Sequence, residues 1–132
     1  MFLTGFAGAG KITCVKVAQC FCFKFYRAVS IPWNNNTFIF SATTGSVTSL
    51  FECQTIHDAA FLNSSAKNIS NKKRQECQSV HVLIIDDISF FTRANLEKLD
   101  YQLNNILGRH DCPYEGVSIV SSGDFHQLRP VK

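Results

Sequence analysis

A glycine-rich loop near the amino terminus constrains the fold of this chain more than any other feature. Gly5, Gly10 and Lys11 have the spacing GxxxxGK. An apolar run precedes the loop, and a stretch without glycine or proline, Lys11 to Arg27, follows it. In a strand, loop and helix of this kind, the loop N–H groups and the positive helix end surround phosphates, and the lysine neutralises the phosphate oxygens. The spacing therefore predicts a strand–loop–helix unit that binds nucleotide phosphates.

The predicted phosphate contacts cover the loop and the first helical turn. These residues are Gly5, Phe6, Ala7, Gly8, Ala9, Gly10, Lys11, Ile12 and Thr13. The motif normally continues with a serine or threonine whose hydroxyl binds magnesium, and Ile12 stands at that position. Thr13 is adjacent, but successive helical residues point about 100° apart, so its hydroxyl should not reach the same place. We expect nucleotide binding to be kept and magnesium placement to be weakened.

Strands and helices are expected to alternate along the rest of the chain. Thr37 to Ser41 alternates as a strand does, His81 to Ile85 has the apolar run of a strand buried on both faces, and Val117 to Ser121 supplies another strand. Between the last two, apolar residues recur at helical spacing from Leu96 to Leu107, and Gly108 ends the helix. This order predicts the α/β class, with a parallel sheet and helices on both faces.

Two segments have weaker patterns. A short helix is expected from Ser46 to about Phe51. Ser64 to Gln78 is polar and basic and is expected to form a surface connection or an irregular helix.

Acidic and polar residues follow two of the predicted strands. Asp86 ends the buried strand, where ligands collect in parallel sheets, and it is the candidate magnesium residue; the alternative is an aspartate that only caps a turn. Asp87 is the candidate base that orients the attacking water. After Gly123 and Asp124, where the last strand ends, Gln127 is placed to contact a γ-phosphate, unless this segment is an ordinary turn.

Composition limits the classes of protein that this chain can represent. With 132 residues, 45% of them hydrophobic and 17% charged, it suits one globular domain. Its apolar stretches are shorter than the roughly 20 residues that cross a bilayer, and its start lacks the basic segment of a signal peptide, so no membrane partner is expected. The six cysteines are irregularly spaced, which favours reduced thiols; a zinc site of Cys20, Cys22 and His57 has no support from spacing. The net charge of +3 selects no partner.

Four segments in one order carry a family resemblance. The segments FLTGFAGAGK, SATTG with TIH, VLIIDDISFF and GVSIVSSGDFHQLRPV resemble the Pif-type DNA helicases of superfamily 1, including those of Helitron transposons, from about Phe2 to Val131. The resemblance implies a P-loop NTPase (RecA-like) fold, with residues 1–132 forming a single partial motor lobe that lacks the second lobe. It also implies ATP and Mg²⁺ as cofactors and 5′-to-3′ movement on single-stranded DNA. Roles in repair, recombination and telomere maintenance, in the nucleus or the mitochondrion, come from the same resemblance, which specifies no oligomeric state.

The resemblance also implies roles for individual residues. Lys11 corresponds to the phosphate lysine, Asp86 to the magnesium aspartate and Gln127 to the γ-phosphate glutamine. Thr44, Gly45 and His57 lie in segments similar to those that contact DNA, where N–H groups and hydroxyls hold backbone phosphates and a ring stacks on a base. The alternative for His57 is a hydrogen-bonded helix start.

Departures from the family pattern support rival interpretations. Ile12 replaces the hydroxyl residue, Asp87 replaces the usual glutamate and is shorter by one methylene, and Arg129 stands where proline is usual. Catalytic geometry tolerates a misplacement of only about 0.5 Å, so Asp87 should slow hydrolysis. One rival is a catalytically dead helicase remnant from a transposon or gene fragment. Another is a different phosphate-loop enzyme such as a small kinase, against which the GDFHQ segment argues.

Overall fold

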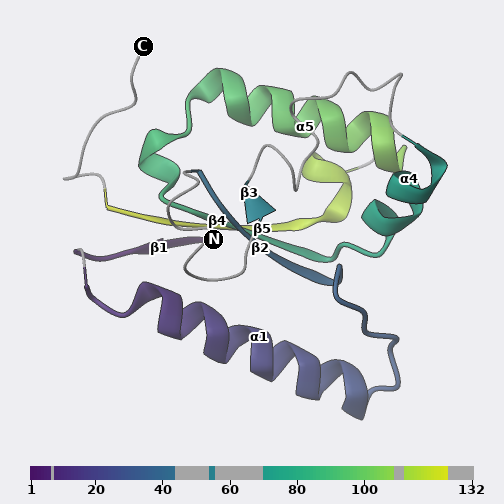
Figure 1. Ribbon diagram of the computed structural model, residues 1–132, viewed down its shortest axis with the longest axis horizontal. Helices are drawn as coiled ribbons and strands as arrows, with labels where there is room; N and C mark the ends of the chain where they lie inside the picture. Colours follow the sequence, from purple (N-terminus) through teal and green to yellow (C-terminus); the bar gives the residue numbers. More distant parts are fainter. Residues whose placement is uncertain (7, 44–53, 56–69, 109–111, 125–132) are drawn as a thin grey trace.

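Five parallel strands form one sheet (Figure 1). A computed structural model describes residues 1–6, 8–43, 54–55, 70–108 and 112–124 of the protein. The elements in chain order are β1 (Phe2–Thr4), α1 (Lys11–Ala28), β2 (Phe38–Ala42), β3 (Gln54–Thr55), α4 (Asn71–Gln78), β4 (Val82–Asp86), η2 (Ile88–Phe90), α5 (Arg93–Leu107), η3 (Pro113–Gly116) and β5 (Ser118–Gly123). The strand order is β1-β5-β4-β2-β3, and every pair is parallel.

Helices cover both faces of this sheet. In Figure 1, α1 lies below the strands, and α4 and α5 lie above them. Alternate residues of β4 point to opposite faces: Leu83 and Ile85 belong to the core under α5, whereas Ile84 packs with Val15 of α1. This two-sided burial explains the uninterrupted apolar run of β4 and confirms the predicted α/β class with both faces covered.

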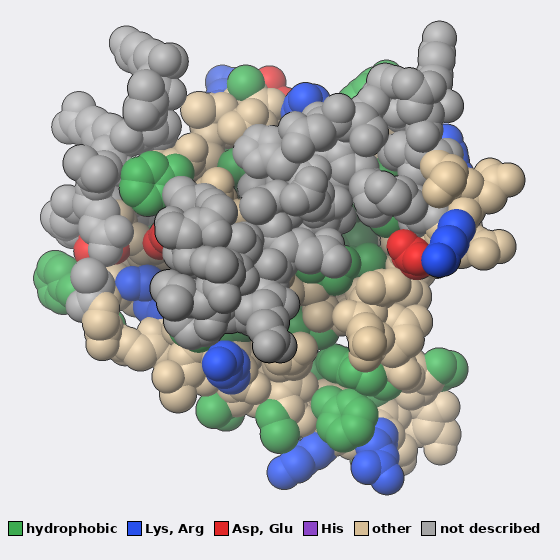
Figure 2. Space-filling model, viewed as in Figure 1, with side chains coloured by type: hydrophobic (Ala, Val, Ile, Leu, Met, Phe, Trp, Pro, Cys, Tyr) green, Lys and Arg blue, Asp and Glu red, His purple; other side chains and the backbone are tan. Residues whose placement is uncertain are grey.

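The two long helices bury very different amounts of apolar surface. In α5, Leu99, Leu103 and Ile106 are buried, whereas Val15 is the buried residue of α1. The outer side of α1 leaves Phe21 68% exposed and Phe25 51% exposed. Figure 2 shows green and blue side chains without red over this helix, at the bottom of the view. Docking of α1 on the sheet therefore depends on a narrow contact.

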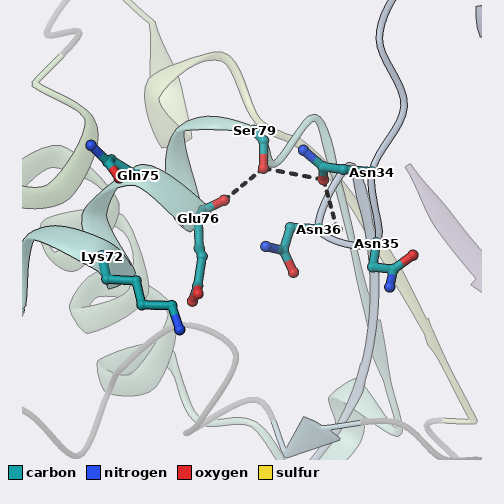
Figure 3. A pocket seen from close by; sticks show the side chains of 7 residues that line it. All are labelled: Asn34, Asn35, Asn36, Lys72, Gln75, Glu76 and Ser79. Atoms are coloured by element: carbon teal, nitrogen blue, oxygen red, sulfur yellow. Dashed lines mark hydrogen bonds between the residues drawn. The ribbon is translucent and has the colours of Figure 1, made fainter.

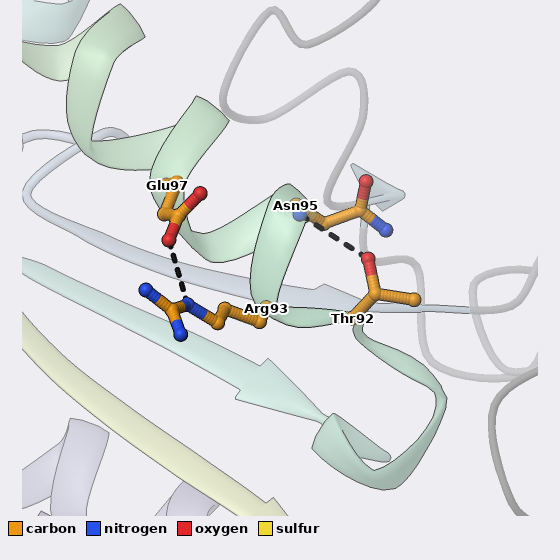
Figure 4. Close-up of polar contacts among 4 residues, drawn as sticks. All are labelled: Thr92, Arg93, Asn95 and Glu97. Atoms are coloured by element: carbon orange, nitrogen blue, oxygen red, sulfur yellow. Dashed lines mark hydrogen bonds and ion pairs between the residues drawn. The ribbon is translucent and has the colours of Figure 1, made fainter.

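The boundaries of α5 follow from local side-chain chemistry. The Thr92 side chain accepts a hydrogen bond from the Asn95 N–H at the start of the helix (Figure 4). Gly108 ends the helix in the left-handed conformation, with φ of 64°, as the sequence predicts. The exposed pair between Arg93 and Glu97 spans 2.7 Å and adds little, because solvent screens such pairs.

Several elements differ from their predicted form. The polar segment after residue 64 ends in the regular helix α4, because Cys77 is buried in contact with the Ile106 region of α5. The strand β5 begins at Ser118, one residue after the predicted start, and ends at Gly123, where the sequence predicts its end. Strand β3 was not predicted, because two residues have no readable periodicity. The helix expected from Ser46 lies outside the described residues.

No helix in the described part of the chain is long and apolar enough to cross a membrane. Within the same part, the cysteines are free thiols: Cys14, Cys20, Cys22, Cys77 and Cys112. Cys53 lies outside it.

Truncation of Leu99 tests the packing of α5 on the sheet. Leu99 is fully buried against the core that contains Leu83 and Ile85. We expect Leu99→Ala to lower the free energy of unfolding by about 2–5 kcal/mol, because the deletion leaves a cavity. The control is Tyr101→Ala on the same helix, where the side chain is 63% exposed and the loss should be below about 0.5 kcal/mol. Urea denaturation measures the free energy of unfolding of both variants. Equal losses would contradict the packing of Leu99 against the sheet.

Candidate nucleotide-binding site

The carboxyl ends of β1, β5 and β4 lie side by side along one edge of the sheet, the edge at which these parallel strands end. Thr4 of β1 pairs with Gly123 of β5, and Ile85 of β4 pairs with Ser121 of β5. Strand β5 therefore separates the loop after β1 from the acidic end of β4 by the width of one strand. Ligands bind at this edge in open α/β sheets.

The glycine loop leads into a helix start without a side-chain cap. Gly8 and Gly10 have φ of 77° and 76°, which glycine adopts without steric cost. Gly10 is the N-cap residue of α1, it makes no side-chain cap hydrogen bond, and the first turn has no acidic residue. The first N–H groups of α1 and its positive end thus suit an anion such as phosphate.

Lys11 folds back onto this loop. Its Nζ donates hydrogen bonds to the carbonyl oxygens of Gly5 at 2.8 Å and Phe6 at 3.1 Å. The ammonium group is therefore held inside the loop, where a bound phosphate would exchange these carbonyls for phosphate oxygens.

Asp86 is a buried carboxylate with a hydroxyl partner. It is 4% exposed, and its Oδ1 accepts a hydrogen bond from the hydroxyl of Ser122, which is 1% exposed. The Asp86 carbonyl accepts from the Thr43 N–H at 3.4 Å. Oxygen ligands of this kind suit magnesium, so Asp86 fits the metal that the family pattern implies. The described residues include no cluster of three or more His, Cys, Asp or Glu side chains that would hold a metal by themselves.

Two hydroxyl groups next to Asp86 were not among the predicted site residues. Thr43 donates its hydroxyl to the Asp87 carbonyl at 3.1 Å, and Ser122 contacts Asp86 across the sheet. Ser41 differs, because its hydroxyl donates to a backbone group, the Ile84 carbonyl, at 2.6 Å. The sequence offered no signal for Ser122, because its approach to Asp86 depends on the pairing of β5 with β4.

Asp87 lies in a strained turn, and its pKa is raised. It adopts φ of 53° at the start of η2. Burial raises the pKa of Asp87 and the negative charge of Asp86 raises it further, while attraction to Lys11 opposes both. The attraction places Lys11 within electrostatic reach of the Asp87 carboxylate, and a raised pKa suits a proton acceptor.

Close contact with β5 holds this turn in place. A Cβ atom on Gly123 would lie 3.2 Å from Ile88 Cγ2 and 3.3 Å from the Ile88 nitrogen. Glycine at this position thus lets the turn after β4 approach the end of β5.

The structure brings together part of the predicted site. Lys11, Asp86 and Asp87 share one sheet edge, and Ile12 is half-buried while Thr13 is exposed. The predicted site residues outside the described part are Ala7, Thr44, Gly45, His57 and Gln127.

A hollow lies at the opposite edge of the sheet, where β2 and β4 begin (Figure 3). It is lined by Asn34, Asn35, Asn36, Lys72, Gln75, Glu76 and Ser79. The Ser79 hydroxyl donates to the Glu76 carbonyl at 2.7 Å and to Asn34 Oδ1 at 3.3 Å. These residues precede β2 and β4, so the hollow is remote from the glycine loop.

The fold and the site together define the chain as a P-loop NTPase lobe of the RecA-like type. The family model for PIF1-like helicases matches residues 1–132, and the chain belongs to that family. It is 29% identical to the ATP-dependent DNA helicase RRM3 of Saccharomyces cerevisiae over 99% of this chain and 18% of that protein. It is 30% identical to the ATP-dependent DNA helicase Pif1 of Psychrobacter over 99% of this chain and 20% of that protein.

Solved structures of Pif1 helicases match the same fold. The Pif1 helicase from Candida albicans superposes with a TM-score of 0.79 at 27% identity, covering 100% of this chain and 30% of that one. The Pif1 helicase from Bacteroides in complex with ADP-AlF3 and single-stranded DNA gives a TM-score of 0.76 at 26% identity, covering 99% of this chain and 29% of that one. The chain spans about a fifth of the length of the two helicases RRM3 and Pif1 named above, from Saccharomyces cerevisiae and Psychrobacter.

Replacement of Asp87 tests the electrostatics of the site. Because the pKa of Asp87 is raised, the folded protein keeps this proton at pH values where the unfolded chain has lost it. Stability therefore falls as the pH rises from the ordinary aspartate pKa through the folded value. We expect Asp87→Asn to gain stability relative to the unmutated protein across that window and to keep a constant advantage above it. Urea denaturation between about pH 3 and pH 8 measures the free energy of unfolding of both proteins. A difference between them that does not change with pH would contradict the raised pKa of Asp87.

Proposed function

We propose that residues 1–132 form a single, partial motor lobe of an ATP-dependent DNA helicase. The observation that carries the proposal is that Lys11 and the uncapped start of α1 share a sheet edge with Asp86 and Asp87. Membership of the PIF1-like helicase family favours ATP as the nucleotide and DNA as the track. The curated relatives carry the name ATP-dependent DNA helicase.

Each residue of the proposed site has a defined task. The loop from Gly5 to Thr13 holds the phosphates through its N–H groups, and Lys11 neutralises the β and γ oxygens. Asp86 would hold magnesium, directly or through water, and the ion supplies charge neutralisation on those oxygens when bound. Asp87 orients the attacking water and accepts its proton, and Gln127 contacts the γ-phosphate.

DNA contact and the cellular role extend the same proposal. Thr44, Gly45 and His57 would bind single-stranded DNA through backbone phosphates and one stacked base. The Bacteroides Pif1 helicase structure contains ADP-AlF3 and single-stranded DNA together, which supports a site for nucleotide and a site for DNA in one protein. We also propose 5′-to-3′ movement, tasks in repair, recombination and telomere maintenance, and residence in the nucleus or the mitochondrion.

A second candidate is a helicase remnant that binds nucleotide without turnover. Ile12 is half-buried at the start of α1 and offers no oxygen to a metal, and Asp87 is one methylene shorter than glutamate. Both features favour slow hydrolysis.

Nucleotide titration tests the proposed phosphate site. We expect weak binding of a fluorescent ATP analogue that barely responds to magnesium, because the loop and Lys11 are present while Ile12 lacks a hydroxyl. Lys11→Ala should weaken binding by roughly 10- to 100-fold with or without magnesium, as loss of a charge-assisted hydrogen bond does. Ile12→Ser should instead create a gain that depends on magnesium. A large magnesium-dependent gain in the unmutated chain would show that another oxygen already replaces that hydroxyl.

A chimera separates the helicase from the remnant. The chain is joined to the second lobe of a family member, and DNA-stimulated ATP hydrolysis is measured. The double change Ile12→Ser with Asp87→Glu should raise hydrolysis far above the unmutated chimera, because both the metal ligand and the base are restored. Each single change should restore little, since a placed metal without an aligned water leaves the reaction slow. Equal rates for the unmutated and doubly changed chimeras would remove the basis of the remnant interpretation.

A further inference from the structure

Ser122 is joined to the proposed magnesium residue by a side-chain hydrogen bond across the sheet. Its hydroxyl donates to Asp86 Oδ1, and both side chains are almost fully buried. Ser122 comes from β5, whereas Asp86 ends β4. A side-chain hydrogen bond in a buried place holds a carboxylate far more firmly than an exposed one does, because water does not compete for the donor.

We propose that Ser122 is a positioning residue that fixes the Asp86 carboxylate for the magnesium–nucleotide complex. This inference rests on the proposed function. The hydroxyl of Ser122 donates to Oδ1 and so fixes the orientation of the carboxylate, whose remaining lone pairs can accept a cation or its water. Partners of this kind restrict the rotation of a ligand and thereby determine where the metal sits.

The substitution at the helix start increases the importance of this contact. With Ile12 in place of a hydroxyl residue, the start of α1 supplies no side-chain oxygen at that position. The position of the ion then depends on Asp86 and the phosphates, so the orientation of Asp86 carries more weight than in a site with both ligands.

The location of Ser122 also connects two parts of the site. Ser122 is followed by Gly123, whose close approach to Ile88 holds the turn that contains Asp87. The end of β5 thus contacts the Asp86 side chain through Ser122 and the Asp87 turn through Gly123. A shift of β5 would move both carboxylates together.

Manganese binding separates positioning from simple stability. The affinity of Mn²⁺ is measured by electron paramagnetic resonance with ATP at the same concentration as the protein, because excess free ATP would itself bind the ion. The measurement is made in the unmutated 132-residue chain and, in parallel, in the chain carrying Ile12→Ser. We expect Ser122→Ala to weaken Mn²⁺ binding by roughly 10-fold or more, the usual loss when a partner of a metal ligand is removed, while ATP affinity without metal is unchanged. Ser122→Thr should restore Mn²⁺ affinity, because it returns the hydroxyl.

Ser41→Ala is the matched control. Ser41 is also fully buried in a neighbouring strand, but its hydroxyl donates to a backbone carbonyl and not to Asp86. It should leave Mn²⁺ affinity unchanged. Unchanged Mn²⁺ affinity in Ser122→Ala, or an equal loss in Ser41→Ala, would overturn the positioning role while ATP binding stands. Absence of ATP binding in the parent chain would instead overturn the proposed function and this inference with it.

Discussion

Parallel pairing of β4 with both β2 and β5 is the constraint on which the rest of the structure depends. It buries Leu83 and Ile85 on one face and Ile84 on the other, so this one strand joins the two cores. Because parallel strands point the same way, the pairing also sets the end of β4 beside the end of β5. The site exists as a consequence of this packing.

Charge balance at the sheet edge follows from the same arrangement. Burial raises the pKa of Asp87, and repulsion from the adjacent carboxylate of Asp86 raises it further. Lys11 and the hydroxyl of Ser122 supply the compensating interactions in the described structure. A site with this balance is suited to a cation and a polyanion together, which is the combination that a magnesium nucleotide presents.

Local patterns predicted most of the fold. The apolar run before Asp86, the helical spacing up to Leu107 and the glycine at 108 each depend on neighbouring residues alone, and all three were found where expected. The two-residue strand β3 was missed, because two residues are too few to show a periodicity and only pairing with Ser41 and Ala42 defines the strand. The hydroxyl contact of Ser122 with Asp86 was missed because the two residues are 36 positions apart.

The sequence by itself determined the glycine loop, the lysine that follows it, the paired aspartates and the membership of a helicase family that these motifs indicate. Those features are local, because a few adjacent residues fix the backbone freedom and charge that each motif needs. Only the tertiary structure decided that Ser122 holds Asp86, that Gly123 admits the Asp87 turn, and that Lys11 folds onto the Gly5 carbonyl. These contacts depend on strand order and register, which arise from burial of both faces of the sheet and leave no pattern in a short stretch of residues.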